Sequence, residues 1–152
     1  SIGLLVAKKL NLNFFDIDKE IEKELGSSIK EIFRSKGESY FRKIEEEITI
    51  NRLKFNSGVI SLGGGGFINY RIRREVLKTN ISFWLNWSNE ILLKRIRNST
   101  KRPLAYNSSD NELIDILKKR SNVYSKALYE IKCDNLSKNE IVNKILNIYE
   151  SR

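Results

Sequence analysis

Val59-Ile60-Ser61-Leu62 runs directly into Gly63-Gly64-Gly65-Gly66, and this stretch of residues 59–66 decides the fold. Its first half is short, apolar and rich in β-branched residues, which is typical of a buried strand. Successive glycines lose much conformational entropy when they become ordered. Such a run is tolerated where the backbone must approach a ligand closely or present its N–H groups, and the alternative is a surface turn. The stretch therefore predicts a strand that ends at a ligand site.

Strands and helices alternate on both sides of this stretch. Apolar runs predict strands over residues 13–18, 59–62, 81–85 and 129–133. Helical spacing predicts helices over residues 1–10, 20–25, 38–55, 71–78, 90–97, 112–126 and 138–149, with a short one after Ser27 or Ser28. This alternation favours a three-layer α/β fold in which helices flank a central parallel sheet. The length of 152 residues favours one domain over residues 1–152.

The composition excludes several classes of chemistry. The chain has no histidine, which excludes Ser-His-Asp and Cys-His catalysis and the common zinc sites. Its single cysteine, Cys133, cannot form an internal disulfide, so we expect a cytoplasmic protein. No apolar run approaches the ~20 residues that span a bilayer, so we expect no membrane partner. The net charge of +9 is spread along the chain, which favours a bias in composition over a nucleic-acid surface.

Acidic residues follow the first predicted strand. Asp16 and Asp18 end that strand, and parallel sheets bind ligands at the carboxyl ends of their strands. Carboxylates at such a place suit a Mg²⁺ shell or a base that positions a hydroxyl group. The alternative is that Asp18 caps a helix beginning at Lys19, and capping is the better interpretation of this pair taken alone.

Three arginines have weaker local signals. Arg42 is at helical spacing from Glu45 and Glu46, and from spacing alone it belongs to a solvated helix face. Arg102 lies in the polar segment 98–111, where an arginine can bring charge to a transition state, although most loop arginines have no such role. Arg120 ends a basic cluster that, taken alone, is a solvated patch.

Taken together, five short stretches carry a resemblance that none of them carries alone. They are Phe15-Asp16-Ile17-Asp18, Phe41-Arg42-Lys43-Ile44-Glu45, Ser61-Leu62-Gly63-Gly64-Gly65, Arg102-Pro103-Leu104, and Arg120 with Tyr124. In this order and spacing the chain resembles shikimate kinase, a small P-loop kinase, over essentially its whole length. The resemblance implies a fold like that of P-loop nucleoside monophosphate kinases, with substrate-binding helices over about residues 18–55 and a mobile lid over about 98–111. It also implies a monomer.

The resemblance implies that the protein transfers the γ-phosphate of ATP to the 3-hydroxyl of shikimate, a step of chorismate and aromatic amino-acid biosynthesis. Asp18 matches the aspartate that binds substrate hydroxyls and orients or deprotonates the attacking one. Arg42 and Arg120 match the arginines that hold the substrate carboxylate. Gly63, Gly64 and Gly65 match the glycine motif that borders the substrate.

The resemblance also implies a nucleotide side. Asp16 matches the acid near Mg²⁺, acting through water. Arg102 matches the lid arginine that reaches the ATP phosphates, and Arg95 matches the arginine that stacks near the adenine. Residues 137–139, Ser-Lys-Asn, are expected to line the adenine from the other side. Ser1 is expected to lie at the Mg²⁺-binding hydroxyl of the P-loop or just after it.

One part of the family pattern is not in the sequence. The glycine loop with its lysine, G-x-x-x-x-G-K-[ST], would precede Ser1, and we expect a strand and loop of ~15 residues there. A chain that began at Ser1 would lack the phosphate cradle, and we would expect it to be inactive. Other hypotheses remain: another small-molecule P-loop kinase, for gluconate or a nucleoside monophosphate; a basic nucleic-acid-binding module; or a pseudokinase scaffold.

Overall fold

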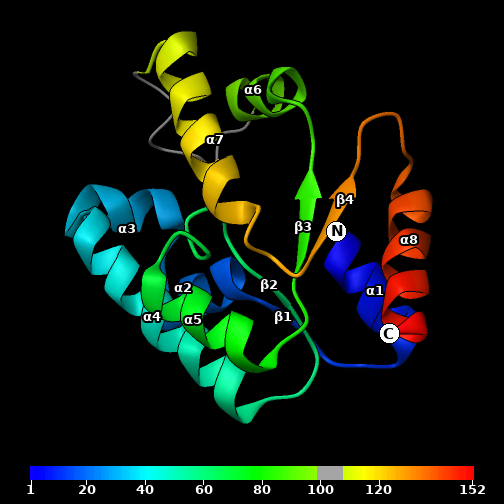
Figure 1. Cartoon of the computed structure of the whole chain (residues 1–152). Coiled ribbons are helices and arrows are strands. Elements are labelled where there is room, and N and C mark those ends of the chain that lie inside the picture. The colour runs from blue at the N-terminus through cyan, green and yellow to red at the C-terminus, as the bar shows by residue number, and fades with distance from the viewer. Residues whose placement is uncertain (99–107) are drawn as a thin grey trace.

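The computed structural model describes residues 1–98 and 108–152 (Figure 1). In chain order its elements are α1 Ile2–Leu10, β1 Phe14–Asp16, α2 Ile17–Leu25, α3 Ile29–Lys36, α4 Glu38–Phe55, β2 Val59–Ser61, α5 Tyr70–Thr79, β3 Phe83–Asn86, α6 Asn89–Arg97, α7 Asp110–Tyr124, β4 Tyr129–Lys132 and α8 Lys138–Ser151. The predicted alternation of strands and helices is confirmed. None of the helices in these two ranges is both long and apolar enough to cross a membrane. The predicted lid, residues 98–111, falls largely on residues 99–107, which lie outside the description.

The strands pair in parallel, as predicted. β1 pairs with β2 so that Phe14 lies opposite Val59 and Asp16 lies opposite Ser61. β3 pairs with β4 from Phe83 opposite Tyr129 to Asn86 opposite Lys132. Within the described ranges the four strands form two pairs that are not hydrogen-bonded to each other. In each pair both strands end at the same edge, and the segments that follow β1 and β2 carry Asp18 and the glycine run.

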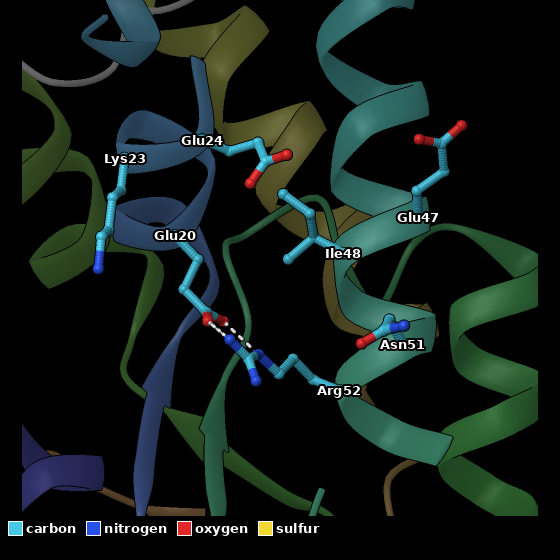
Figure 2. A pocket seen from close by; sticks show the side chains of 7 residues that line it. All are labelled: Glu20, Lys23, Glu24, Glu47, Ile48, Asn51 and Arg52. Carbon is cyan, nitrogen blue, oxygen red and sulfur yellow. Dashed lines mark hydrogen bonds and ion pairs between the residues drawn. The ribbon is translucent and has the colours of Figure 1, made fainter. Parts of the chain in front are cut away.

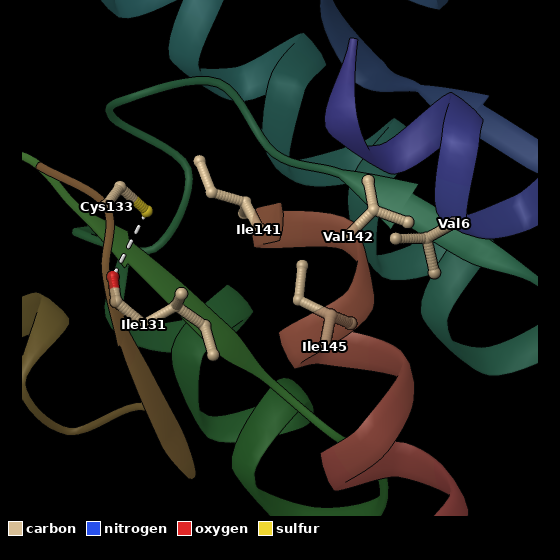
Figure 3. Close-up of a cluster of buried hydrophobic side chains, with 6 residues drawn as sticks. All are labelled: Val6, Ile131, Cys133, Ile141, Val142 and Ile145. Atoms are coloured by element: carbon tan, nitrogen blue, oxygen red, sulfur yellow. Dashed lines mark hydrogen bonds between the residues drawn. The ribbon is translucent and has the colours of Figure 1, made fainter. Parts of the chain in front are cut away.

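One hydrophobic cluster lies where α1 and α8 pack beside β3 and β4 (Figures 1 and 3). Its buried members are Val6, Ile131, Cys133, Ile141, Val142 and Ile145. Cys133 follows β4 directly, and its thiol donates to the carbonyl oxygen of Ile131 at 3.2 Å. Burial raises the pKa of the Cys133 thiol, so the group stays neutral. Cys133 therefore acts as a packing residue, as the sequence suggested.

A second cluster joins α2, α3 and α4 around buried Ile17, Ile21, Ile32 and Phe41. Helix α4 has the predicted bounds, because Gly37 (φ 86°) ends α3 and the chain extends again at Asn56. Hydrophobic spacing along residues 38–55 predicts a buried face of Phe41, Ile44, Ile48 and Leu53. The fully buried residues are instead Phe41, Glu45 and Thr49, with Ile44, Ile48 and Leu53 half-buried.

The first strand is shorter than predicted. It ends at Asp16, whose carboxylate accepts a hydrogen bond from the backbone N–H of Lys19 at 3.2 Å and caps α2. The capping interpretation thus applies to Asp16, and Asp18 lies inside the first turn of α2. The helix begins early because Ile17 and Ile21, four residues apart, are both completely buried on its inner face. Gly26, at φ 62°, ends the helix as predicted.

Candidate functional site

Asp18 and the glycine run meet at the carboxyl ends of β1 and β2. Asp16 lies opposite Ser61 in the parallel pair, so the residues that follow each strand leave the sheet side by side. Two residues further along each chain segment are Asp18 and Gly63. A Cβ atom built on Gly63 would lie only 2.7 Å from Oδ1 of Asp18. The carboxylate therefore lies directly against backbone that has no side chain.

Arg42 meets the same run two residues later. A Cβ atom on Gly65 would lie 2.6 Å from Cζ and 2.8 Å from Nη2 of Arg42, both too close for any side chain to fit without displacing the guanidinium. Gly63 and Gly65 thus face an acid from α2 and a base from α4. The glycine run forms a turn in which Gly64 is exposed, and its backbone approaches these two side chains closely. The approach to a ligand stays a prediction.

Two carboxylates on its own helix hold Arg42. Its Nη1 donates to Oε1 of Glu45 at 2.9 Å, and its Nη2 lies 3.4 Å from Oε2 of Glu38. The Glu45 side chain is 1% exposed, whereas that of Arg42 is 29% exposed, so the pair is buried at its acidic end. The expected solvated face is therefore wrong for Arg42. Glu46, the other predicted partner, instead accepts from Asn69 and Arg71 across α5, each at 2.9 Å.

Helix α7 reaches the glycine run through Tyr124. The tyrosine hydroxyl donates to the carbonyl oxygen of Gly64, which lies between the glycines that face Asp18 and Arg42. Arg120 is half-buried on the same helix, one turn before Tyr124. Asp18 from α2, Arg42 from α4 and Tyr124 from α7 thus converge on the β2–α5 loop. That the Arg120 side chain joins them stays a prediction.

The residues expected on the nucleotide side lie on other elements. Ser1 caps α1, and its Oγ accepts from the backbone N–H of Leu4 at 3.3 Å. Arg95 is on α6 with its guanidinium 4.5 Å above the ring of Trp87. Ser137 caps α8, and its Oγ accepts from the N–H of Glu140 at 3.1 Å. Arg102 lies outside the described residues, and its role stays a prediction.

Two contacts organise this side. Asp134 accepts from the backbone N–H of Ser88 at 2.9 Å, so the β4–α8 loop is tied to the β3–α6 loop. Arg97, at the end of α6, binds Asp110 at the start of α7 at 3.1 Å. The first contact brings the starts of α6 and α8 together where β3 and β4 end, and the second joins the far end of α6 to the start of α7.

Asp16, which the sequence assigned to a metal site, lies at the end of β1. No group of three or more acidic, cysteine or histidine side chains able to hold a metal ion occurs in residues 1–98 and 108–152. Asp16 uses its Oδ1 to cap α2, and this leaves its second oxygen for another ligand. Mg²⁺ commonly takes one or two protein oxygens and completes its shell with water and phosphate. The donor set thus fits Mg²⁺ bound with a nucleotide.

A separate hollow of about 680 Å³ lies on the outer side of α2 and α4 (Figure 2). It is lined by Glu20, Lys23, Glu24, Glu47, Ile48, Asn51 and Arg52. Within it Arg52 binds Glu20, with Nε 3.1 Å from Oε2, and the guanidinium lies 4.6 Å over the ring of Phe15. This pair joins α2 to α4. None of the lining residues was predicted as a site residue.

Sequence reasoning missed two features of the candidate site. It assigned no burial to Glu45, although the Arg42–Glu45 spacing suggested the ion pair. It named Tyr124 as part of a motif but gave it no role. Tyr124 and Gly64 are 60 residues apart in the sequence, and a contact over this separation cannot be predicted from local sequence patterns.

Comparison with known proteins gives concordant matches. A family model described as "Shikimate kinase" matches residues 1–150. The shikimate kinase of Persephonella marina is 37% identical over 146 residues, which cover 96% of this chain and 88% of that protein. The crystal structure of shikimate kinase from Aquifex aeolicus superposes with a TM-score of 0.87 at 33% identity, covering 99% of this chain and 88% of that one.

A third match was solved with a bound ligand. Shikimate kinase from Acinetobacter baumannii, in complex with shikimate, superposes with a TM-score of 0.92 at 28% identity and covers 99% of this chain and 85% of that one. The family match extends over every residue of the edge described above, from Ser1 to Ser137. These matches confirm the α/β fold class that the alternation of elements predicted.

Proposed function

The chain belongs to the shikimate kinase family, and from this premise we propose that Asp18, Arg42, the glycines 63–65 and Arg120 form its shikimate-binding site. The protein is an ATP-dependent kinase that phosphorylates shikimate. The other functional hypotheses, a different small-molecule kinase or a nucleic-acid-binding module, are not favoured. The proposal concerns which side chains of this chain bind shikimate and assist the phosphate transfer.

The single observation that carries the proposal is the contact of Gly63 with Asp18 and of Gly65 with Arg42. A hydroxylated carboxylic acid needs an acceptor for its hydroxyl groups and a cation for its carboxylate. Guanidinium groups bind carboxylates through two parallel hydrogen bonds, and a carboxylate suits a hydroxyl donor. Backbone without side chains between the two groups lets a small ring lie against both.

Asp18 is the group placed to act on the attacking hydroxyl. The Asp18 carboxylate accepts a hydrogen bond from that hydroxyl and orients the hydroxyl oxygen toward the phosphorus. It takes the hydroxyl proton as the oxygen–phosphorus bond forms. Its place in the first turn of α2 is fixed by the Asp16 cap. Arg42 and Arg120 hold the far end of the substrate, which converts the transfer into a reaction between oriented groups.

The nucleotide is proposed to bind beside the starts of α1, α6 and α8. The N-terminus of α1 presents backbone N–H groups and a positive dipole, which suit phosphate. Arg95 is proposed to stack near the adenine, with residues 137–139 on its other side. Asp16, through water, and Ser1 are proposed to hold Mg²⁺, which would neutralise phosphate charge when bound. ATP is the co-substrate.

Arginine substitution tests the substrate side. We expect Arg42→Ala to weaken shikimate binding about tenfold or more in titration calorimetry, because a charge-assisted hydrogen-bond pair is lost. We expect ATP binding to change by less than about twofold. Arg34→Ala is the matched control, because Arg34 is an exposed arginine that binds Glu31 on α3.

A companion variant separates binding from folding. Arg42→Lys keeps a positive charge beside buried Glu45 but loses the planar fork, so we expect it to retain most of the stability and little of the shikimate affinity. An equal loss of ATP and shikimate binding in both variants would contradict the assignment of Arg42.

A further inference from the structure

Tyr124 joins helix α7 to the glycine run by a hydrogen bond from its hydroxyl to the carbonyl of Gly64. We propose that Tyr124 is a positioning residue: this bond sets the place of Arg120 relative to the glycine run and thereby sets the affinity for the substrate carboxylate. The proposal rests on the proposed function, because it takes Arg120 as a carboxylate-binding residue.

The helix geometry links the two side chains. Tyr124 is the last residue of α7, and Arg120 lies four residues earlier, about 6 Å along the axis and on the same side of the helix. At the other end of α7, Asp110 is bound by Arg97. A bond at Tyr124 therefore fixes the end of the helix that is nearer to Arg120.

The bond connects Arg120 to both other substrate groups through one short piece of backbone. Gly64 lies between Gly63, which contacts Asp18, and Gly65, which contacts Arg42. A shift of α7 relative to this run would move Arg120 away from Arg42, and two guanidinium groups can share a carboxylate only within a narrow range of geometry. The hydrogen bond from Tyr124 to Gly64 thus fixes the positions of Asp18, Arg42 and Arg120 relative to one another.

The bond is not needed to satisfy a buried carbonyl. Gly64 is exposed, so its carbonyl oxygen could bind water instead. The tyrosine ring has its own packing, with its centroid 6.1 Å from that of Trp84 and contacts to the cluster around Phe67 and Ile72. Removal of the hydroxyl alone should leave this packing in place. What the hydroxyl adds is the position of α7 against the glycine run.

The test is Tyr124→Phe, with shikimate and ATP binding measured by titration calorimetry. We expect shikimate to bind about three- to tenfold more weakly, the range for loss of one hydrogen bond, and ATP to bind within about twofold of the parent. Tyr129→Phe is the matched control, because Tyr129 is half-buried on β4 and stacks on Phe83 at 5.4 Å, away from the glycine run. Tyr124→Met serves as a second variant without a donor if Tyr124→Phe lowers the melting temperature.

A double-mutant cycle separates positioning from a merely structural role. In an Arg120→Ala background, we expect Tyr124→Phe to change shikimate affinity by less than about twofold, because the group that it positions is gone. The carboxamide of shikimate, which lacks the charge, should lose little affinity in Tyr124→Phe. Additive effects, or equal losses for acid and amide, would overturn the proposal.

The outcomes also distinguish the two proposals. If Arg120→Ala leaves shikimate affinity unchanged, the assignment of Arg120 fails and the proposal for Tyr124 fails with it. If Arg120→Ala weakens binding and Tyr124→Phe does not, only the proposal for Tyr124 fails.

Discussion

Arg42 and Glu45 lie one helical turn apart on α4, and the Nη1 atom of Arg42 donates to the buried Oε1 of Glu45 at 2.9 Å. A carboxylate that is 1% exposed must be paired, because an isolated buried charge is costly. The same guanidinium lies against Gly65. One side chain thus pairs with a buried carboxylate and also lies against the glycine run.

Loss of the Glu45 carboxylate should reduce both stability and shikimate binding. We expect Glu45→Ala to lower the free energy of unfolding by about 2 kcal/mol, since a buried partner of a charge is removed and Arg42 remains partly hydrated. Glu45→Gln, which can still accept from Arg42, should lose less. Urea denaturation measures the first effect and calorimetry the second.

Glu38 provides the control for this prediction. It binds the same arginine at 3.4 Å, but its side chain is 50% exposed. Exposed pairs contribute little, so Glu38→Ala should change stability by less than about 1 kcal/mol. Equal effects of Glu38→Ala and Glu45→Ala would show that burial does not decide the strength of this pair.

Gly65→Ala should impair binding rather than folding. The added methyl group would overlap the Arg42 guanidinium, whose Cζ is 2.6 Å from the Cβ position, and would push it out of line with the substrate. We expect shikimate affinity to fall about tenfold or more, the range for loss of a charged contact, as measured by calorimetry.

Gly26→Ala is expected to behave in the opposite way. No atom lies within 4 Å of a Cβ there, but the residue has φ +62°, where alanine is strained. It should lower the free energy of unfolding by about 1 kcal/mol and leave shikimate binding unchanged. A Gly65→Ala protein that binds shikimate normally would contradict the contact between Gly65 and Arg42.

Thr49→Val should stabilise the protein. The Thr49 hydroxyl is fully buried on α4, and it has no hydrogen-bond partner among the residues that the structure describes. Valine has the same shape without the polar atom, so we expect the free energy of unfolding to rise by about 1 kcal/mol in urea denaturation. Thr79→Val, at an exposed position at the end of α5, should have almost no effect. Destabilisation by Thr49→Val would show that the hydroxyl has a partner after all.

The sequence determined much of the fold because its signals are local. Gly37 and the turn at Asn56 bound α4 at the predicted residues, and strand ends in a parallel sheet had to share an edge. The hydrophobic pattern failed to predict the buried face of α4, because tertiary packing determines that face. Glu45 and Thr49 are polar, so hydrophobic spacing pointed to Ile44 and Ile48 instead, and only the packing of α2 and α3 against α4 shows which side is buried.

The candidate site was predictable to a similar degree. The meeting of Asp18 and the glycines followed from the shared edge of parallel strands, whereas Arg42 was placed there only by the family resemblance. The contact between Tyr124 and Gly64 depends on how α7 returns across the sheet edge. The site roles, the single domain, the monomeric state and the cytoplasmic location stay predictions, as does the role of Arg102.

Gly63 and Gly65 make one wall of the candidate site out of main chain, with no side chain to exchange. Divergence toward a differently shaped acceptor therefore cannot proceed by small changes along that wall. It requires substitutions on the surrounding helices α2, α4 and α7, because only their side chains can alter which molecule is accepted.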